Sequence, residues 1–364
     1  MRDFNIEYKD IITHIEQAPA IQSLLELRKV KAPIIMYGLG EQATLLLAFC
    51  NYYSIQIAGF ADGKKRGEFD NRHIAIMSPD ELFLAYPNAI ILISSWKYNK
   101  EIFDTLIQLG YWEEQIYKFP FSHPYFLLRE FFETHYLEGY KRAYEFFKDD
   151  LSKKIILDRI RAYLYDELLV KTSNKPKYFE FPFADKEVFV QAGTYCGETV
   201  KEFLGLYSPE QDYEIYSFEA DPQAYEISKN ALSNLKNINL INKGLWGTET
   251  ILTFYTDALS GGASFVNGHN NEIQTPVTSL DTFFMDNPTS ITFIQLDIEG
   301  AELEALKGAE QIIRNQKPKL AICVYHKYED VYEIPELLYQ YNPEYKFWLQ
   351  HCEDGIYDTV LYAM

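Results

Sequence analysis

Short apolar segments alternate with amphipathic segments over the last half of the chain, and this alternation constrains the fold more than any other feature. Five apolar segments favour strands, namely EVFVQAG, YEIYSFEAD, NINLINKGL, ITFIQLDIEG and KLAICVYH. Helical sequences such as PQAYEISKNALSNL and AELEALKGAEQIIRNQ lie between them. Strands that alternate with helices indicate a parallel sheet. The stretch KFWLQHCEDGIYDTVLYAM predicts an antiparallel hairpin around Asp354 and Gly355 that closes this sheet.

A smaller α/β pattern occupies the beginning of the chain. After a helical lead-in, residues 34–37 predict a strand, residues 41–53 a helix and residues 55–60 a second strand. The segments NAIILISSW and KEIFDTLIQLG add a buried strand and an amphipathic helix that ends at Gly110. The chain therefore contains two α/β units of different size.

The segment between the two units has a different character. It has helical periodicity and many aromatic residues but few turn signals. We therefore expect an α/β fold class with a Rossmann-like domain at residues 1–119, a helical connector at 120–177 and a larger Rossmann-like domain at 178–364. A strand, KYFEFPF, is predicted at the start of the last domain. The connector is expected to pack on a domain or to join two copies of the chain as a homodimer.

Composition excludes several classes of partner. The net charge of −19 repels phosphate backbones and anionic lipid surfaces, so we expect no nucleic-acid partner. No apolar run reaches the length of a membrane span, and the N-terminus lacks the apolar core of a signal peptide. The four cysteines are widely separated, which argues against a disulfide framework or a zinc site. A cytoplasmic location is the simplest interpretation.

The sequence VFVQAGTYCGETVKEFL predicts a strand, a glycine-bearing turn and the start of a helix. Gly193 and Gly197 allow the backbone to turn sharply and to approach a ligand closely. Polar groups at the start of the helix come from Thr194, Glu198 and Thr199. A Gly-x-x-x-Gly spacing alone is a weak signal of a nucleotide-cofactor loop.

Later strands add candidates for the same site. Glu219 ends the next strand, 26 residues after Gly193, where a carboxylate can accept hydrogen bonds from ribose hydroxyls. Asp221, before Pro222, instead suits a helix N-cap. Gly244 and Leu245 follow the third strand and could flank an adenine, although an ordinary exit from a strand explains them equally well.

Three acids lie at the strand-to-helix turn of FIQLDIEGAELEALKGA. Favourable interaction with the helix dipole explains Glu302. It explains Asp297 less well, because a carboxylate at the carboxyl end of a strand lies where open α/β sheets bind ligands. Glu299 follows on the same turn, and His326 ends the next apolar strand. If the two strands are neighbours, these side chains meet at one edge of the sheet.

These segments, in this order, resemble the FkbM family of S-adenosylmethionine-dependent methyltransferases. The resemblance covers residues 178–364 and rests on VFVQAGTYCGET, YSFEADPQAYEISKNAL, NKGLWG, VTSLDTFF and, above all, IQLDIEGAELEALKGA. It implies a Rossmann-like methyltransferase fold, S-adenosylmethionine as cofactor and a hydroxyl of a sugar or natural product as acceptor. It also implies cofactor contacts for Gly193, Thr194 and Glu219, and a reacting centre at Asp297, Glu299 and His326.

Gln191 departs from the family pattern, which usually has Asp at this position. Glutamine keeps an acceptor oxygen and adds a donor but loses the charge. A lost charge-assisted hydrogen bond is worth roughly 1.5–3 kcal/mol, which weakens affinity without abolishing it. We therefore expect a working cofactor site formed by Gln191, Gly193, Thr194, Gly197, Glu198, Thr199, Glu219, Gly244 and Leu245.

Methyl transfer to a hydroxyl benefits from a general base, for which Asp297, Glu299 and His326 are the candidates. Acids at this turn could instead hold Mg²⁺. We favour a site without metal, because the turn offers few oxygen ligands beyond Asp297 and Glu299. The polar segment LSGGASFVNGHNNE, residues 259–272, is expected to be a lid or acceptor-binding loop, or else a surface excursion.

The first domain contains Gly38-x-Gly40-x-x-Ala43, with Asp62 in the ribose position. It looks like the Rossmann-like N-terminal domains attached to nucleotide-sugar enzymes, and it either binds a nucleotide or serves packing and dimerisation. We therefore predict a methyltransferase that uses S-adenosylmethionine and acts on a hydroxyl of a sugar or nucleotide-linked sugar. The alternatives are a non-catalytic nucleotide- or S-adenosylmethionine-binding module and an NAD-linked sugar oxidoreductase.

Overall fold

The computed structural model describes residues 3–70, 73–207, 212–256, 263–264, 272–285 and 288–364. The chain divides into a C-terminal unit, residues 138–156 with 169–364, and an N-terminal unit, residues 2–137 with 157–168. The segment expected as a connector contributes to both units, and so does its longest helix, α8 (Asp150–Tyr165). Among the described residues no helix has the length and apolar character needed to cross a membrane.

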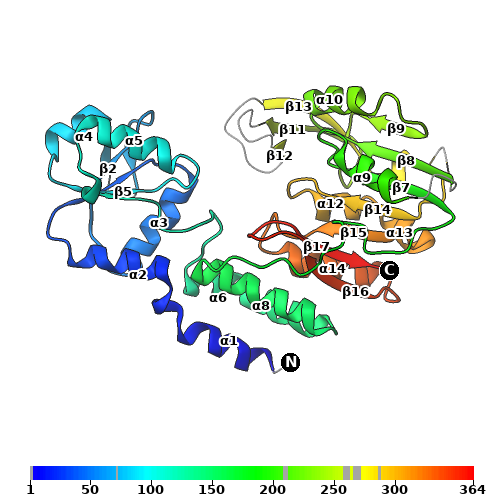
Figure 1. Cartoon of the computed structure of the whole chain (residues 1–364), viewed down its shortest axis with the longest axis horizontal. Helices are drawn as coiled ribbons and strands as arrows, with labels where there is room; N and C mark the ends of the chain where they lie inside the picture. Colours follow the sequence, from blue (N-terminus) through cyan, green and yellow to red (C-terminus); the bar gives the residue numbers. More distant parts are fainter. Residues whose placement is uncertain (1–2, 71–72, 208–211, 257–262, 265–271, 286–287) are drawn as a thin grey trace. The chain divides into compact units, whose positions relative to one another are not determined.

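A six-stranded sheet with the order β3-β4-β2-β1-β5-β6 forms the centre of the N-terminal unit (Figure 1). Neighbouring strands run parallel except for the edge pair of β3 and β4. The strands are β1 (Ile34–Tyr37), β2 (Ile57–Ala61), β3 (Glu68–Phe69), β4 (Ile74–Met77), β5 (Ile90–Ile93) and β6 (Ile116–Tyr117). The helices are α1 (Phe4–Thr13), α2 (Pro19–Glu26), α3 (Glu41–Tyr52), α4 (Pro79–Ala85), α5 (Asn99–Leu109) and α6 (Arg129–His135), with short 3₁₀ turns at Ile15–Gln17, Leu27–Lys29 and Glu113–Gln115. The smaller α/β fold expected from the sequence is confirmed.

The C-terminal unit contains a seven-stranded sheet with the order β16-β17-β15-β14-β7-β8-β9 (Figure 1). Five of these strands, β7, β8, β9, β14 and β15, are parallel to one another, whereas β17 is antiparallel to β15 and forms an antiparallel hairpin with β16 at one edge, as the sequence predicts. The strands are β7 (Lys186–Ala192), β8 (Asp212–Phe218), β9 (Ile238–Ile241), β14 (Phe293–Leu296), β15 (Lys319–Cys323), β16 (Phe347–His351) and β17 (Thr359–Ala363). The helices are α7 (Leu137–Phe146), α9 (Glu198–Leu206), α10 (Pro222–Leu232), α11 (Leu280–Phe283), α12 (Glu302–Lys307), α13 (Glu310–Gln316) and α14 (Asp330–Tyr341).

Strand β7 comes first in the chain and lies in the middle of this sheet. The chain adds β8 and β9 on one side of β7 and later places β14 and β15 on the other side. The order of the strands therefore reverses between β7 and β14, where Gln191 pairs with Gln295. In open α/β sheets, ligands bind at the carboxyl ends of the strands at such a switch point.

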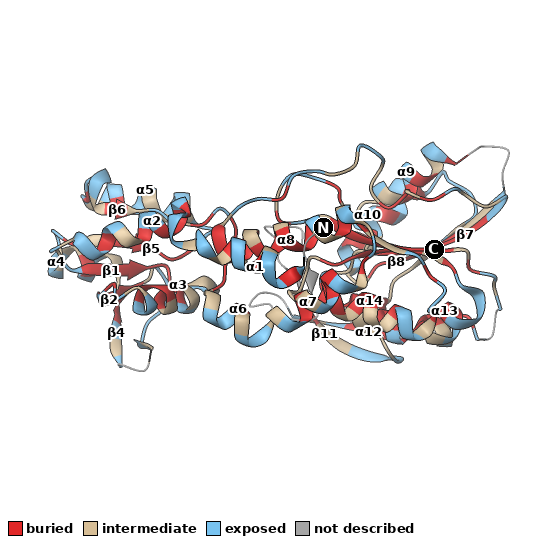
Figure 2. Cartoon of the chain, turned by 90° about the horizontal axis from the view of Figure 1, so that it is seen from below, coloured by how far each residue is buried: buried red, intermediate tan, exposed pale blue. Residues whose placement is uncertain are grey.

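The predicted strand at KYFEFPF is wrong, because residues 177–183 have no regular strand structure. Their aromatic side chains instead cover one face of the sheet. Phe179 and Phe181 both contact the ring of Phe293, which is stacked on Phe189 with the ring centroids 4.7 Å apart. Figure 2 shows the buried strands in red and the outward faces of helices such as α9 and α13 in pale blue. The alternation of aromatic residues thus reflects packing on a sheet face rather than pairing within a sheet.

A second, four-stranded sheet with the order β10-β13-β11-β12 was not anticipated. Its strands are β10 (Gly244–Leu245), β11 (Thr250–Thr256), β12 (Ala263–Ser264) and β13 (Glu272–Thr278). The segment expected as a lid, residues 259–272, lies outside the described residues except at positions 263–264 and 272. Its expected role therefore stays a prediction.

Two helical glycines of the C-terminal unit provide a matched test of this packing. A Cβ atom on Gly139 of α7 would lie 2.5 Å from ring atoms of the buried Tyr332 of α14, whereas a Cβ on Gly205 of α9 would meet nothing within 4 Å. We expect Gly139→Ala to lower the free energy of unfolding by about 1–3 kcal/mol, because the ring must move. Gly205→Ala should raise it by about 0.5–1 kcal/mol through helix propensity. Urea unfolding curves measure both, and equal stabilisation by the two substitutions would contradict the packing of α7 on α14.

Candidate functional site

The loop after β7 has, at two positions, a backbone conformation that favours glycine. Gly193 has φ +86°, and a Cβ atom there would lie 1.8 Å from the carbonyl oxygen of Asp297 at the end of β14. Gly197 has φ +78°, and its Cβ would lie 2.8 Å from the side chain of Leu232 on α10. The loop is therefore pressed against the end of β14, and helix α9 starts directly after it at Glu198.

Gln191 forms hydrogen bonds with the same loop through its side chain. Its side chain is fully buried, and its Nε2 donates to the carbonyl oxygen of Gly193 at 2.8 Å. Its Oε1 accepts hydrogen bonds from the hydroxyls of Thr194 at 3.0 Å and Ser217 at 2.6 Å. Asp could not supply the N–H donor. The departure from the family pattern therefore has a structural use in this chain, since both ends of the Gln191 amide are bonded.

Glu219 follows β8 beside this loop, with only 8% of its surface exposed. Its carboxylate accepts hydrogen bonds from the backbone N–H groups of Tyr195 at 2.8 Å and Asp221 at 2.9 Å. Burial raises the pKa of Glu219, although these hydrogen bonds act in the opposite direction. Asp221 caps α10 by accepting a hydrogen bond from the N–H of Gln223, as expected. A carboxylate has about four acceptor positions, so Glu219 keeps capacity for ribose hydroxyls.

The other predicted cofactor residues lie in different surroundings. Glu198 and Thr199 start α9, and Glu198 is exposed. Gly244 and Leu245 form β10 and are buried beside β13. Packing within the small sheet explains why Leu245 is buried, and its described surroundings do not mark it as a ligand contact.

Asp297 follows β14 and receives an unusual number of donors. Its carboxylate accepts hydrogen bonds from the hydroxyl of Tyr178 at 2.5 Å and the hydroxyl of Tyr325 at 3.0 Å. The ammonium group of Lys177 lies 3.3 Å from the same carboxylate and also pairs with Asp358. Burial alone would raise the pKa of Asp297, but Lys177, followed by the other partners, holds it at about 2. Asp297 is therefore ionised at neutral pH and accepts hydrogen bonds only.

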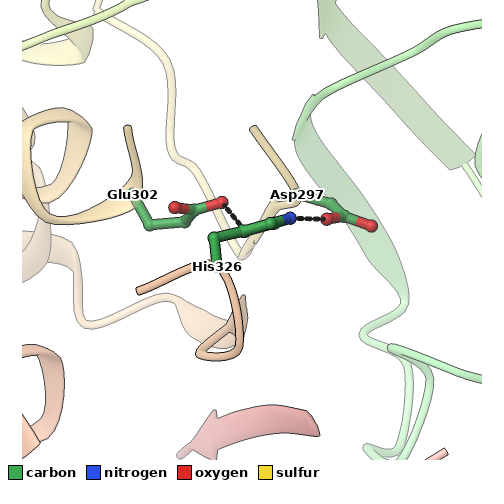
Figure 3. Close-up of side chains that lie close together, drawn as sticks. All are labelled: Asp297, Glu302 and His326. Carbon is green, nitrogen blue, oxygen red and sulfur yellow. Dashed lines mark ion pairs between the residues drawn. The ribbon is translucent and has the colours of Figure 1, made fainter. Parts of the chain in front are cut away.

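His326 lies among three carboxylates, of which Figure 3 shows Asp297 and Glu302. Its Nδ1 is 2.9 Å from Oε1 of Glu302, while its Nε2 is 3.5 Å from Asp297 and 3.6 Å from Glu299. Burial lowers the pKa of His326, but the three acids outweigh burial and raise it to about 9. The side chain of Glu299 is half-exposed, and partial burial raises the pKa of its carboxyl group. The backbone of Glu299 has φ +56°. As expected from the sequence, one edge of the sheet brings together Asp297, Glu299 and His326.

Four residues of this cluster were not assigned to the site from the sequence. Tyr178 and Lys177 come from the segment before β7, which the sequence suggested to be a strand. Tyr325 directly precedes His326, and its place at the end of an apolar strand gave no reason to assign it to the site. Glu302 was explained by the helix dipole, but it is fully buried and faces His326. Asp297, Glu302 and His326 each offer a donor atom within 4.8 Å of the other two, a spacing that could hold a metal ion.

The glycine loop of the N-terminal unit differs from that of the C-terminal unit. Asp62, in the ribose position, accepts hydrogen bonds from the backbone N–H groups of Leu39, Lys64 and Lys65 at 2.7–2.8 Å. Gly38 has φ +91°, and a Cβ there would lie 2.7 Å from the side chain of Ile102. Local packing therefore accounts for both residues, and no contact in the described part of this unit points to a ligand.

Comparison with known proteins identifies the C-terminal unit. Residues 192–354 match the family model described as the methyltransferase FkbM domain, while no curated protein sequence matches the chain. The crystal structure of methyltransferase FkbM from Methylobacillus flagellatus KT is similar over 98% of this chain and 99% of that chain, with a TM-score of 0.61 and 18% identity. At that identity the likeness shows a common fold.

Two other solved structures overlap about half of the chain. They are an rRNA methylase from Streptococcus thermophilus, with 17% identity, a TM-score of 0.31 and coverage of 49% of this chain and 86% of that chain, and fibrillarin from Aeropyrum pernix with natively bound S-adenosyl-L-methionine, with 12% identity, a TM-score of 0.33 and coverage of 51% and 70%. The family match and the observed fold agree with the glycine loop and acid cluster described above. The family match over residues 192–354 and the observed fold together indicate that the C-terminal unit is a methyltransferase domain.

Proposed function

We propose that the C-terminal unit binds S-adenosylmethionine at the loop after β7 and methylates a hydroxyl of a sugar or sugar-containing metabolite. One observation carries the proposal: the glycine loop touches the backbone of Asp297, so a cofactor held by the loop lies next to the cluster of acids and His326. Gly193 and Thr194 would line the methionine end of the cofactor, and the carboxylate of Glu219 would accept hydrogen bonds from its ribose.

The chemistry of the acid cluster supports a hydroxyl-bearing acceptor. Asp297 and Glu299 present carboxylates, which accept hydrogen bonds and repel anions such as phosphate. A sugar offers several hydroxyl donors in a fixed arrangement, which matches two carboxylates on one turn. A nucleotide-linked sugar fits only if its diphosphate lies away from Asp297, Glu299 and Glu302.

S-adenosylmethionine supplies an electrophilic methyl group on a sulfonium centre. The protein must hold the acceptor oxygen in line with that group, which lowers the entropic part of the barrier. Asp297, Glu299 and His326 surround the edge of the sheet where this oxygen would lie, and they orient the hydroxyl by hydrogen bonds. The hydroxyl proton then passes to Glu299, whose side chain is 51% exposed and can release the proton to water.

A non-catalytic binding module is the weaker alternative. The neutral Gln191 was the sequence feature that favoured it, but both ends of the Gln191 amide form hydrogen bonds, with the loop and with Ser217 of β8. The NAD-linked oxidoreductase has less support still, because three backbone N–H groups use three of the about four acceptor positions of the Asp62 carboxylate and leave less capacity for two ribose hydroxyls than Glu219 has. We therefore retain methyl transfer as the function.

Removal of the Glu219 carboxylate tests the cofactor assignment. Glu219→Ala should lose the ribose contacts at a cost of roughly 1.5–3 kcal/mol, which corresponds to an increase of about 10- to 100-fold in the Kd for S-adenosylmethionine. The neighbouring cap substitution Asp221→Ala is the control, because it removes a helix cap and no expected ribose contact. Calorimetric titration measures both, and an unchanged Kd for folded Glu219→Ala would refute the ribose role.

A pair of equally short substitutions tests the role of Gln191. Asn and Asp have the same length, but only Asn retains an N–H donor for the carbonyl oxygen of Gly193. We expect Gln191→Asp to bind S-adenosylmethionine more weakly than Gln191→Asn, because its buried carboxylate would face a carbonyl oxygen. Titration of both variants decides the matter. Tighter binding by Gln191→Asp would mean that charge at this position matters more than the donor.

The reacting centre is tested by transfer of a trideuterated methyl group, followed by mass spectrometry across a panel of sugars and nucleotide sugars. Asp297→Asn and His326→Ala should each lower turnover by roughly 10²-fold, because the hydroxyl that passes its proton to Glu299 would no longer be held in position. Their Kd for S-adenosylmethionine should stay close to that of the wild type. Methylation of nitrogen or sulfur compounds in place of hydroxyls would overturn the proposed acceptor. Near-normal turnover in both variants would remove these residues from the mechanism.

A further inference from the structure

Three side chains from different elements converge beside the proposed acceptor position (Figure 3). Asp297 follows β14, Glu302 begins α12 and His326 follows β15. One donor atom of each lies within 4.8 Å of the donor atoms of the other two. Ligands of one divalent ion lie about 2.0–2.6 Å from it, so two ligands of the same ion are separated by at most about twice that length.

The buried atoms of this group lack the partners that burial normally requires. Oε2 of Glu302 has no hydrogen-bond partner. The ring nitrogens of His326 form ion-pair contacts, Nδ1 with Glu302 at 2.9 Å and Nε2 with Asp297 at 3.5 Å, but neither contact has hydrogen-bond geometry. Glu302 is fully buried, and the side chain of His326 is only 7% exposed. Buried polar atoms without partners are rare in native proteins, and an ion or water bound between them is a common reason for them.

The local charge also favours a cation. Glu299 places a third carboxylate near His326, in addition to Asp297 and Glu302. Lys177 pairs with both Asp297 and Asp358. It contacts Oδ2 of Asp297, whereas His326 faces Oδ1 of the same carboxylate. Three carboxylates therefore face the single imidazole of His326, and a metal ion bound between them would replace one of its ring protons.

We infer that Asp297, Glu302 and His326 bind one divalent metal ion. Two carboxylates and one imidazole suit ions such as Mn²⁺, with water completing the coordination. The sequence favoured a metal-free site because oxygen ligands beyond Asp297 and Glu299 were lacking. The structure supplies two further donors, Glu302 and His326, and so removes that premise.

The role of the ion rests on the proposed function, whereas its binding does not. An acceptor hydroxyl that coordinates the ion is fixed in position, and its proton becomes more acidic. That proton moves to the carboxylate of Glu299, which is not needed as a ligand and is open to water. The carboxylate of Asp297 already accepts several hydrogen bonds and is therefore a weak base. A bound ion would activate the sugar hydroxyl in its place.

Metal binding is measured on the full chain after treatment with a chelator, by calorimetric titration with Mn²⁺ and by the loss of the free Mn²⁺ signal in electron paramagnetic resonance. We expect one site per chain. Glu302→Gln should weaken binding by more than about tenfold, the smallest effect usual for disturbed metal sites. Glu304→Gln is the matched control, since Glu304 lies on the same helix and pairs with Lys307. If Glu302→Gln does not fold, Asp297→Asn replaces it.

The outcomes separate this inference from the proposed function. A single Mn²⁺ site weakened by Glu302→Gln and not by Glu304→Gln supports the metal site, even if no sugar is methylated. Absence of a Mn²⁺ site in the folded wild type, with methyl transfer unaffected by EDTA, overturns the metal site and leaves the proposed function intact. Binding that is equal in wild type, Glu302→Gln and Asp297→Asn would also overturn it, because the ion would then lie elsewhere.

Discussion

The contact between Gly193 and the carbonyl oxygen of Asp297 determines how the rest of the site is arranged. No side chain fits at Gly193, because its Cβ would lie 1.8 Å from that oxygen and its φ is +86°. The contact brings the end of β7 against the end of β14, at the point where the order of the strands reverses. A cofactor loop and a cluster of acids that are about a hundred residues apart in sequence therefore become neighbours.

Two kinds of polar group meet at this point and have different physical tasks. The amide of Gln191 and the hydroxyls of Thr194 and Ser217 are neutral, buried and mutually bonded, so they fix the shape of the loop. Asp297 and His326 are charged and belong to a cluster in which acids predominate. Burial of charge is costly unless it is compensated, and the donors around Asp297 supply part of that compensation. The remaining carboxylates are the reason to expect a cationic or hydroxyl-rich ligand.

The sequence predicted those parts of the site that depend on local pattern. Apolar runs located β7, β8, β14 and β15, and their carboxyl ends indicated Glu219, Asp297 and His326. Residues 177–183 were misassigned, because aromatic alternation looks alike for a strand and for a segment that packs across a sheet face. Glu302 was missed for a related reason: its position at a helix start has a local explanation, and only the neighbouring strand reveals that it faces His326. Long-range packing of this kind leaves no mark in local periodicity.

The most direct test of the central claim is a crystal structure of the protein with S-adenosylhomocysteine. The account predicts that the ribose hydroxyls lie within hydrogen-bond distance, about 2.6–3.2 Å, of the Glu219 carboxylate. It also predicts that the sulfur faces the edge of the sheet that carries Asp297 and His326. A product molecule bound in another part of the chain, or one whose sulfur points away from Asp297 and His326, would contradict the account.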